Sequence, residues 1–365
     1  MKNEYSFKFV PEVIFGCAKR NILHEKLSHF ERKMLICGNH FARSRVFSEL
    51  FGAREDYFVH TVKSAEPTLE MVQTALDFAR ENQVQAIVAI GGGSVMDTGK
   101  AVAGLFNQSG SVEDYFYCRQ ELAGDRIFFC AMPTTAGTGA EVTPNAVLSD
   151  SKSGIKQSIR GKVFGVDLAI VDPELTYDCP DDLVRFSGMD ALTQAIEAAI
   201  SAKANHLTFG WSMQSFRLIF ENLQAAYKGD LEAKNKVAEG TLVGAMAFPF
   251  SGLGAVHGLA HPIGSLYHLP HGFVCGVLLG HILKINRDFL YEAAQNYYGL
   301  CGTPEKLLND IASLADALEI PCNFKGYLKK EDFPFIIKNC RSGSMKCNPV
   351  ELADSDIEKL LESLI

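Results

Sequence analysis

The first half of the chain alternates short apolar runs with longer amphipathic stretches. Between the runs, helical periodicity covers residues 41–51 and 68–82, and a third helix is expected to begin at Ser94. Strands that alternate with helices of about ten to fifteen residues predict βαβ units, and therefore a parallel sheet with helices on its faces. The apolar runs typical of strands cover residues 34–37, 57–62, 84–90, 127–132 and 167–173.

After about residue 180 the strand pattern fades and helical periodicity takes over. Residues 181–201 and 206–229 carry this period, and Gly229 is a typical helix stop. Prolines at the Asp172-Pro173 and Cys179-Pro180 steps interrupt the chain between the two patterns. We therefore predict an α/β domain over residues 1–177 and an all-helical domain over residues 178–365.

Composition narrows the class of protein. The 365 residues are 47% hydrophobic and 21% charged, as in an ordinary soluble globular protein. The net charge of −8 argues against nucleic acid and anionic membranes as partners. The ten cysteines contain no CxxC pair, and MKNEYSFKF lacks the apolar stretch of a secretory signal. The uncharged stretch over residues 240–283 is broken by prolines and does not predict a membrane span. We expect a cytoplasmic protein with reduced thiols.

Glycine-rich sequence directly follows one of the apolar runs. In VQAIVAIGGGSVMDTGKA, the triplet Gly91, Gly92 and Gly93 stands between a strand and the helix that begins at Ser94. Glycines let the backbone turn sharply and approach a ligand closely, and the free amides at a helix N-terminus bind anions. The pattern predicts a pyrophosphate cradle, with Asp97 hydrogen-bonded to a sugar or to the nicotinamide amide. A plain strand-to-helix turn is the alternative, since short glycine motifs also occur without ligands.

A second loop of small residues follows the next apolar run. In MPTTAGTGAEV, over residues 132–142, Thr134, Thr135 and Thr138 offer hydroxyl groups that can line an adenosine or the nicotinamide ribose. Ligands of open α/β sheets bind outside the carboxyl ends of the strands. Two such loops after neighbouring strands favour a dinucleotide site over an ordinary loop.

The second half of the chain gathers residue types that bind metals. Asp190 and Gln194 are four residues apart in a predicted helix, so they project from one face. Imidazole nitrogen together with carboxylate oxygen suits Fe²⁺ or Zn²⁺. A single histidine in an apolar stretch is usually a packed core residue, but four of them with a carboxylate nearby predict a metal site. The four lie within fifteen residues: His257, His261, His268 and His271.

Taken together, these motifs resemble the iron-containing (group III) alcohol dehydrogenase family. The resemblance is carried, in order, by GGGSVMDTGK, PTTAGTGAEV, GMDALTQAIEA and GAVHGLAHPIGSLYHLPHG, and covers about residues 11 to 355. It implies a Rossmann-like N-terminal domain for the dinucleotide and an all-helical C-terminal domain for the metal, the dehydroquinate synthase-like architecture. It also implies a cleft between the domains and a homodimer.

The resemblance implies roles for individual residues of the helical half. The metal ligands would be Asp190, Gln194, His257 and His271, and His261 would relay a proton or orient the substrate. Gln194 departs from the family pattern, which has histidine there. Its amide oxygen can coordinate a metal without changing the charge of the site, but the loss of one imidazole predicts weaker binding of borderline metals.

The choice of nicotinamide depends on the end of the run at residues 34–37. A carboxylate there would bind the ribose 2′-hydroxyl and repel a 2′-phosphate. In this sequence Gly38 stands where NAD-preferring relatives tend to carry aspartate, and Asn39 adds a hydrogen-bond donor. We therefore predict NADP(H), with NAD(H) as the alternative. The resemblance also brings Lys156 near the nicotinamide, although an ordinary surface lysine fits that position equally well.

The predicted function is that of a metal-dependent, NAD(P)-linked alcohol dehydrogenase or aldehyde reductase. Hydride would pass between the nicotinamide and a small alcohol or aldehyde held at Fe²⁺, or at Zn²⁺ as the alternative. Two other functions stay open at this point. One is a nucleotide-binding protein whose metal site has decayed, with Gln194 as the first symptom. The other is a dehydroquinate-synthase-like lyase, although the phosphate-binding cations and extra acid that it would need are not evident.

Overall fold

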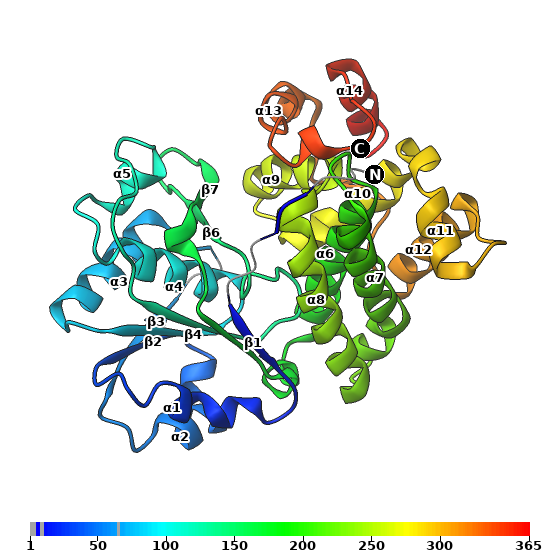
Figure 1. The fold of residues 1–365 in the computed structure, drawn as a ribbon. Coiled ribbons are helices and arrows are strands. Elements are labelled where there is room, and N and C mark those ends of the chain that lie inside the picture. Colours follow the sequence, from blue (N-terminus) through cyan, green and yellow to red (C-terminus); the bar gives the residue numbers. More distant parts are fainter. Residues whose placement is uncertain (1–4, 8–10, 64–65) are drawn as a thin grey trace. The chain divides into compact units, whose positions relative to one another are not determined.

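The computed structural model describes residues 5–7, 11–63 and 66–365. The N-terminal segment that was compared with a secretory signal lies partly outside these residues. Contacts divide the chain into a sheet unit and a helical unit. The sheet unit covers residues 11–135 and 139–178, while the helical unit covers residues 179–365 together with residues 5–7 and 136–138. The predicted fold class, a parallel α/β half followed by an all-helical half, is confirmed (Figure 1).

The sheet unit is built on six parallel strands in the order β1-β8-β5-β4-β2-β3. Every residue of β4 is buried, as expected for a central strand covered on both faces. The apolar runs of the sequence match five of these strands to within two residues at either end. The strands are β1 (Glu12–Phe15), β2 (Lys33–Gly38), β3 (Tyr57–Val62), β4 (Ala86–Gly91), β5 (Phe128–Pro133) and β8 (Leu168–Val171).

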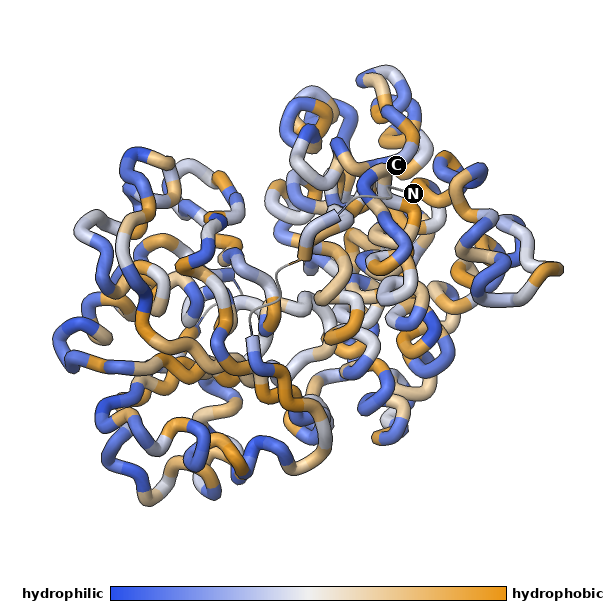
Figure 2. Tube along the Cα trace, viewed as in Figure 1, coloured by the Kyte–Doolittle hydropathy of each residue, from blue (hydrophilic) through white to orange (hydrophobic). Residues whose placement is uncertain are grey.

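Helices cover both faces of this sheet because successive strand residues point to opposite sides. Leu35, Val88 and Cys130, from three adjacent strands, form one core with Leu23 and Phe51 of α1 and α2. Figure 1 shows α3 and α4 on the other face, and Figure 2 shows the strands between them as a hydrophobic layer. The helices are α1 (Leu23–Lys26), α2 (Arg45–Phe51), α3 (Leu69–Glu81), α4 (Gly93–Leu105) and α5 (Val112–Phe116).

Three strands were not predicted from the sequence. The edge strand β1 has only four residues, and none of them is fully buried. An antiparallel hairpin pairs β6 (Asn145–Ser149) with β7 (Lys156–Arg160). The β7 sequence KQSIR has a single buried residue, Ile159, so it lacks the apolar alternation that indicates a strand.

The helical unit is organised around α6, which is buried on all sides from Gly188 to Ile200. It packs against α7, α8 and α10. Among the described residues no single helix is long and apolar enough to cross a membrane, although α8 and α9, bent by 103°, meet the length and composition test as a pair. The helices are α6 (Asp181–Ile200), α7 (His206–Tyr227), α8 (Leu231–Ser251), α9 (Ala255–Tyr267), α10 (His271–Ile285), α11 (Tyr291–Tyr298), α12 (Pro304–Ala317), α13 (Phe333–Asn339) and α14 (Asp354–Glu362).

Short 3₁₀ helices complete the two units. They lie at Lys19–Ile22, Phe41–Arg43, Lys162–Phe164, Pro173–Thr176, Arg287–Phe289, Lys330–Asp332 and Met345–Cys347.

We predict that the start of α10 tolerates no added methyl group, because the helix lies directly against α6. A Cβ at Gly272 would lie 1.9 Å from the carbonyl oxygen of Phe186, a backbone atom that cannot swing away. We expect Gly272→Ala to lower the free energy of unfolding by about 1–3 kcal/mol. Gly280, in the same helix, has open space at its Cβ position, so Gly280→Ala should be neutral or stabilising by up to about 1 kcal/mol.

Urea unfolding of both variants, followed by circular dichroism, measures this difference. Equal stabilities for the two variants would contradict the close approach of α10 to α6.

Candidate metal centre and nucleotide-binding edge

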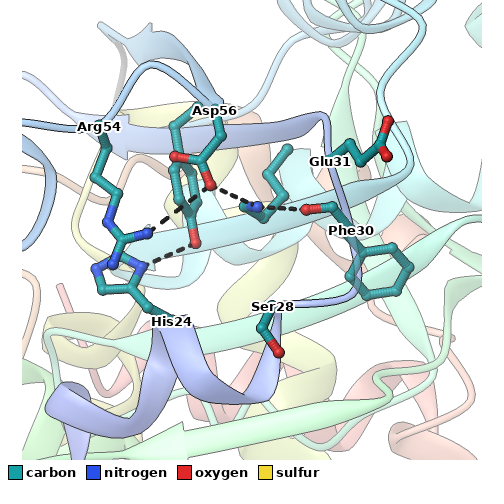
Figure 3. Close-up of a pocket in the computed structure, with 8 residues that line it drawn as sticks. His24, Ser28, Phe30, Glu31, Arg54 and Asp56 are labelled. Atoms are coloured by element: carbon teal, nitrogen blue, oxygen red, sulfur yellow. Dashed lines mark hydrogen bonds and ion pairs between the residues drawn. The ribbon is translucent and has the colours of Figure 1, made fainter.

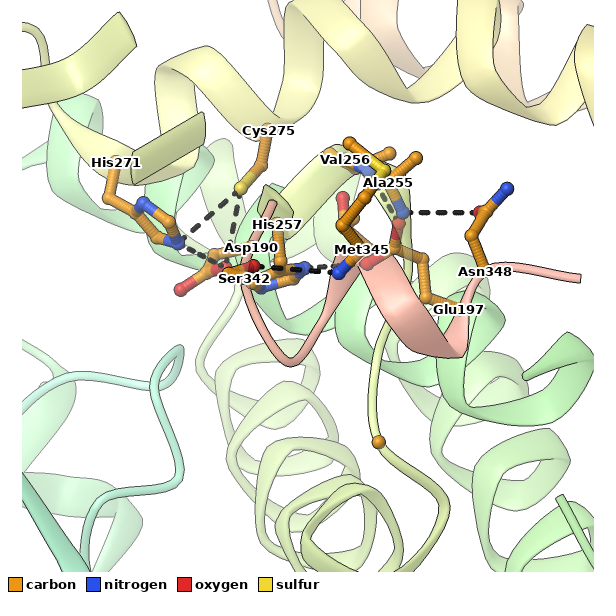
Figure 4. A network of polar contacts seen from close by, with 12 residues as sticks. Asp190, Glu197, Ala255, Val256, His257, His271, Cys275, Ser342, Met345 and Asn348 are labelled. Atoms are coloured by element: carbon orange, nitrogen blue, oxygen red, sulfur yellow. Dashed lines mark hydrogen bonds and ion pairs between the residues drawn. The ribbon is translucent and has the colours of Figure 1, made fainter. Parts of the chain in front are cut away.

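Four side chains from three helices of the helical unit converge on one point (Figure 4). Asp190 comes from the middle of α6 and His257 from the first turn of α9. His271 is the first residue of α10, and Cys275 follows it by one helical turn. One ligand atom from each side chain lies within 4.8 Å of all the others. Three of these residues were predicted as ligands, whereas Cys275 was not.

The distances within this cluster suit a shared cation. Asp190 Oδ1 lies 3.2 Å from His257 Nε2 and 3.6 Å from His271 Nε2. The Asp190 and His257 side chains are 5% and 4% exposed, but that of His271 is 30% exposed. The cluster is therefore buried on the side of α6 and α9 and accessible beside His271.

Glu197, a residue that the sequence analysis missed, fixes the position of His257. Its Oε2 lies 2.7 Å from His257 Nδ1, and its Oε1 accepts a 2.7 Å hydrogen bond from the backbone N–H of Val256. A carboxylate behind a ligating imidazole sets the tautomer that points Nε2 at the metal. Glu197 lies seven residues after Asp190, on the same face of α6, and this spacing was the signal that could have identified it.

The ionisation of the cluster follows from these contacts. Burial disfavours the charged imidazolium of His257, but the hydrogen bonds to Asp190 and Glu197 outweigh it and raise the pKa of His257 to about 10. Burial also opposes ionisation of Asp190, yet His271 and His257 hold the pKa of this carboxyl below its usual value. Burial raises the pKa of the Cys275 thiol. Without metal the site holds protons that a cation would have to displace.

The other predicted residues of this half lie around the cluster. Gln194 is buried one turn after Asp190 on α6. The ring of His261 stacks on that of His271, with centroids 5.2 Å apart. His268 is exposed, caps the end of α9 and takes no part in the cluster.

The donor set fits a divalent transition metal. One carboxylate, two imidazoles and a thiol combine the nitrogen, oxygen and sulfur ligands that zinc and iron accept. Burial strengthens this fit, because a cation would balance the buried negative charges of Asp190 and Glu197.

Several of the predicted cofactor residues of the sheet unit collect at one edge of the sheet. Cys37 of β2 pairs with Ile90 of β4, and Gly91 of β4 pairs with Pro133 of β5. Gly38, Gly91 and Thr134 therefore follow one another across three adjacent strand ends. From β2 the chain continues to β3 on one side, and from β4 it continues to β5 on the other side. Open α/β sheets bind dinucleotides at such a reversal of strand order.

The two small-residue loops touch each other at this edge. The backbone N–H of Thr134 donates a 2.9 Å hydrogen bond to the carbonyl oxygen of Gly91. A Cβ at Gly91 would lie 2.5 Å from Val95, so only glycine permits this tight turn into α4. Gly92 is the N-cap of α4 and makes no side-chain capping hydrogen bond, and the N-terminus of a helix is a favourable place for an anion.

A buried ion pair lies in α4 just after this turn. Asp97 Oδ1 is 2.9 Å from Nζ of Lys100, a fully buried lysine that also donates to Thr143 Oγ1 at 3.3 Å. Lys100 balances the charge of Asp97, so the carboxylate does not repel a phosphate bound at the turn. Burial raises the pKa of the neighbouring Glu141 to about 7. The sequence analysis missed Lys100 because an isolated lysine in a helix usually lies at the surface.

Three predicted cofactor residues lie apart from this turn. Asn39 is exposed just after β2. Thr138 is exposed and groups with the helical unit. Lys156, at the start of β7, forms a 2.6 Å ion pair with Glu66, so its proposed contact with the nicotinamide stays a prediction.

A separate cavity of about 420 Å³ opens at the opposite end of β2 and β3 (Figure 3). Lys33 lies 2.7 Å from Asp56 and donates to the carbonyl of Phe30, and Arg54 also lies near Asp56. Lys33 and Arg54 both pair with Asp56, and the cavity lies at the amino ends of these strands rather than at the carboxyl ends where ligands bind. We assign it no role in the chemistry.

Comparisons with known proteins agree with this arrangement. A family model described as iron-containing alcohol dehydrogenase matches residues 11–173, and the model of the C-terminal domain of that family matches residues 185–365. Alcohol dehydrogenase 4 of Saccharomyces cerevisiae is 32% identical over 306 residues, which cover 81% of this chain and 80% of the yeast protein.

Two further relatives extend the likeness. Aldehyde-alcohol dehydrogenase 2 of Entamoeba histolytica is 33% identical over 283 residues, and the chain spans 32% of that protein's length. A crystal structure of sulfoacetaldehyde reductase from Bifidobacterium kashiwanohense in complex with NAD+ superposes with a TM-score of 0.94 at 26% identity, covering 100% of this chain and 99% of that one.

We predict that Glu197 controls metal affinity through His257. Glu197→Gln keeps the size of the side chain but removes the charge behind the imidazole. We expect the dissociation constant for Zn²⁺ to rise by about 10- to 100-fold, as measured by competition with a chromogenic chelator. Glu292→Gln, a change at an exposed position of α11, is the control. Equal affinities for wild type and Glu197→Gln would show that Glu197 serves packing alone.

Proposed function

This chain belongs to the iron-containing alcohol dehydrogenase family, and we propose that it interconverts small alcohols and aldehydes at a divalent metal held by Asp190, His257 and His271. It is an NAD-linked alcohol oxidoreductase. The observation that carries the proposal is the convergence of one carboxylate and two imidazoles from three helices within 4.8 Å. We propose that residues 1–177 bind the cofactor and that residues 178–365 bind the metal, a division close to that between the regions matched by the two family models.

When bound, the metal would polarise the substrate oxygen and the nicotinamide would exchange a hydride with the substrate. The chain's own residues prepare this step. Glu197 holds His257 in the tautomer that presents Nε2, and Asp190 supplies the negative charge that retains a cation. The accessible side of the cluster, beside His271, leaves room for a substrate.

His261 is the proposed proton relay. It lies one helical turn after His257 on α9, and its ring stacks on that of His271. Both His261 and His271 are partly exposed, so a proton that reaches His261 can pass to solvent. An imidazole titrates near neutral pH, which suits this role in both directions of the reaction.

The proposed cofactor is NADP(H), with NAD(H) as the alternative. The pyrophosphate would lie at the N-terminus of α4, beside Gly91, Gly92 and Gly93. The absence of a carboxylate at Gly38 supports acceptance of a 2′-phosphate, and the exposed Asn39 offers it a donor. Fe²⁺ is the proposed metal, as in the name of the family, and Zn²⁺ is the alternative that the same donors accept.

The rival function, a nucleotide-binding protein with a decayed metal site, is favoured by one observation only. Gln194 replaces the fourth ligand of the family pattern. Against it stands the intact arrangement of Asp190, His257 and His271, together with the carboxylate of Glu197 behind them. A decayed site would gain nothing by keeping two buried carboxylates beside the buried imidazole of His257, because such groups are costly to bury.

Activity measurements on the full chain test the proposed function. We expect oxidation of NADPH or NADH with a panel of short aliphatic aldehydes after loading with Fe²⁺ or Zn²⁺, and loss of this activity on treatment with a chelator. Asp190→Ala should lower kcat/KM by about 100-fold or more, because the cation loses its only carboxylate ligand. Asp288→Ala, at a side chain that is 85% exposed, is the control. Cofactor binding without turnover of any aldehyde would favour the rival function.

A second measurement tests the choice of cofactor. A Cβ at Gly38 meets no atom within 4 Å, so the first atom of an aspartate side chain has open space there. We expect Gly38→Asp to lower kcat/KM for NADPH by about tenfold or more while NADH is retained, because the carboxylate repels a 2′-phosphate. Steady-state kinetics with both cofactors measures this. A wild-type enzyme that strongly prefers NADH would overturn the NADP(H) assignment.

A further inference from the structure

Cys275 belongs to the cluster of possible metal ligands together with Asp190, His257 and His271. We propose that Cys275 binds the metal as a thiolate and that the centre of this chain is an Asp-His-His-Cys site. The proposal deepens the function proposed above and rests on the presence of a divalent cation at Asp190, His257 and His271. Figure 4 shows the sulfur of Cys275 directed towards Asp190 and His271.

Four of the six separations between these ligand atoms are close to those of ligands around one ion. Cys275 Sγ lies 3.6 Å from His271 Nε2 and 3.7 Å from Asp190 Oδ1. Asp190 Oδ1 lies 3.2 and 3.6 Å from the two imidazole nitrogens. A tetrahedral ion with bonds of about 2.0–2.1 Å to oxygen and nitrogen and about 2.3 Å to sulfur separates its ligand atoms by about 3.3–3.6 Å. These pairs of ligand atoms are therefore already close to the separations expected around a bound metal.

The position of Cys275 on α10 keeps its thiol away from solvent. His271 and Cys275 are four residues apart on α10 and so project from the same face. Cys275 is fully buried, and α10 is held against α6 by the contact between Gly272 and Phe186. Among the ten cysteines, all of which are free and lie in the described part of the chain, Cys275 alone belongs to the metal-ligand cluster.

The chemistry of the two candidate ligands separates them. An uncharged amide such as that of Gln194 is a weak ligand that suits oxygen-preferring ions, whereas a thiolate binds zinc and other borderline metals strongly. With Asp190 and the thiolate both negative, the centre would be electrically neutral rather than carry one positive charge. A thiolate from α10 thus replaces the imidazole that is missing from α6, and the metal preference of the site shifts towards Zn²⁺.

Cobalt substitution in the full chain tests the proposal without measuring activity. Co²⁺ bound through a thiolate shows a near-ultraviolet sulfur-to-metal charge-transfer band. We expect this band in the wild type and in Cys340→Ser, a change at a second buried thiol of the helical unit, and its loss in Cys275→Ser. We also expect Cys275→Ser to weaken Zn²⁺ binding by at least about tenfold, and by a larger factor than Gln194→Ala.

X-ray absorption at the zinc edge of the wild type provides the same test if Cys275→Ser fails to fold. One sulfur neighbour at about 2.3 Å supports the proposal. Bound metal without a sulfur neighbour, or a charge-transfer band that survives in Cys275→Ser, overturns it and leaves the proposed function intact. A wild type that binds neither Co²⁺ nor Zn²⁺ overturns the proposed function, and this inference with it.

Discussion

The arrangement of the metal centre depends on the buried carboxylate of Glu197. One of its oxygens lies 2.7 Å from His257 Nδ1, and the other accepts a hydrogen bond from the N–H of Val256. α6 thereby fixes both the first turn of α9 and the imidazole that this turn carries. A buried charge of this kind is stable only when it is paired and fully hydrogen-bonded, so α9 has one favourable position on α6. Asp190 lies on the same face of α6 and meets His257 from the opposite side of the ring.

Sequence patterns predicted the main elements and part of the centre. The run YFVHTV coincides with β3, and residues 181–201 coincide with α6 to within one residue, because each carries a clear period. The histidine spacing predicted His257 and His271 as ligands, and the structure brings both into the cluster. Cys275 and Glu197 were missed, since a cysteine or glutamate inside a helical run resembles ordinary core or surface sequence until the helices are packed together. KQSIR was missed as a strand because its pairing depends on β6 rather than on its own composition.

The two halves of the chain provide their sites by different physical means. At the edge of the sheet the candidate site is formed mainly by the backbone, through glycines that admit a close turn and through the N-terminus of α4. Such a site is visible in sequence as a glycine pattern. In the helical half the site consists of side chains from α6, α9 and α10, and its completeness is visible only in three dimensions. Under the proposed Asp-His-His-Cys site, the change at Gln194 is compensated from another helix.

The central claim is that one divalent cation lies among Asp190, His257 and His271. The most direct measurement is a crystal structure of the zinc-loaded protein with anomalous diffraction data collected on both sides of the zinc absorption edge. The account predicts one strong anomalous peak within about 2.0–2.3 Å of a ligand atom from each of these three side chains. A fully folded, zinc-loaded crystal with its anomalous peaks only elsewhere would contradict it.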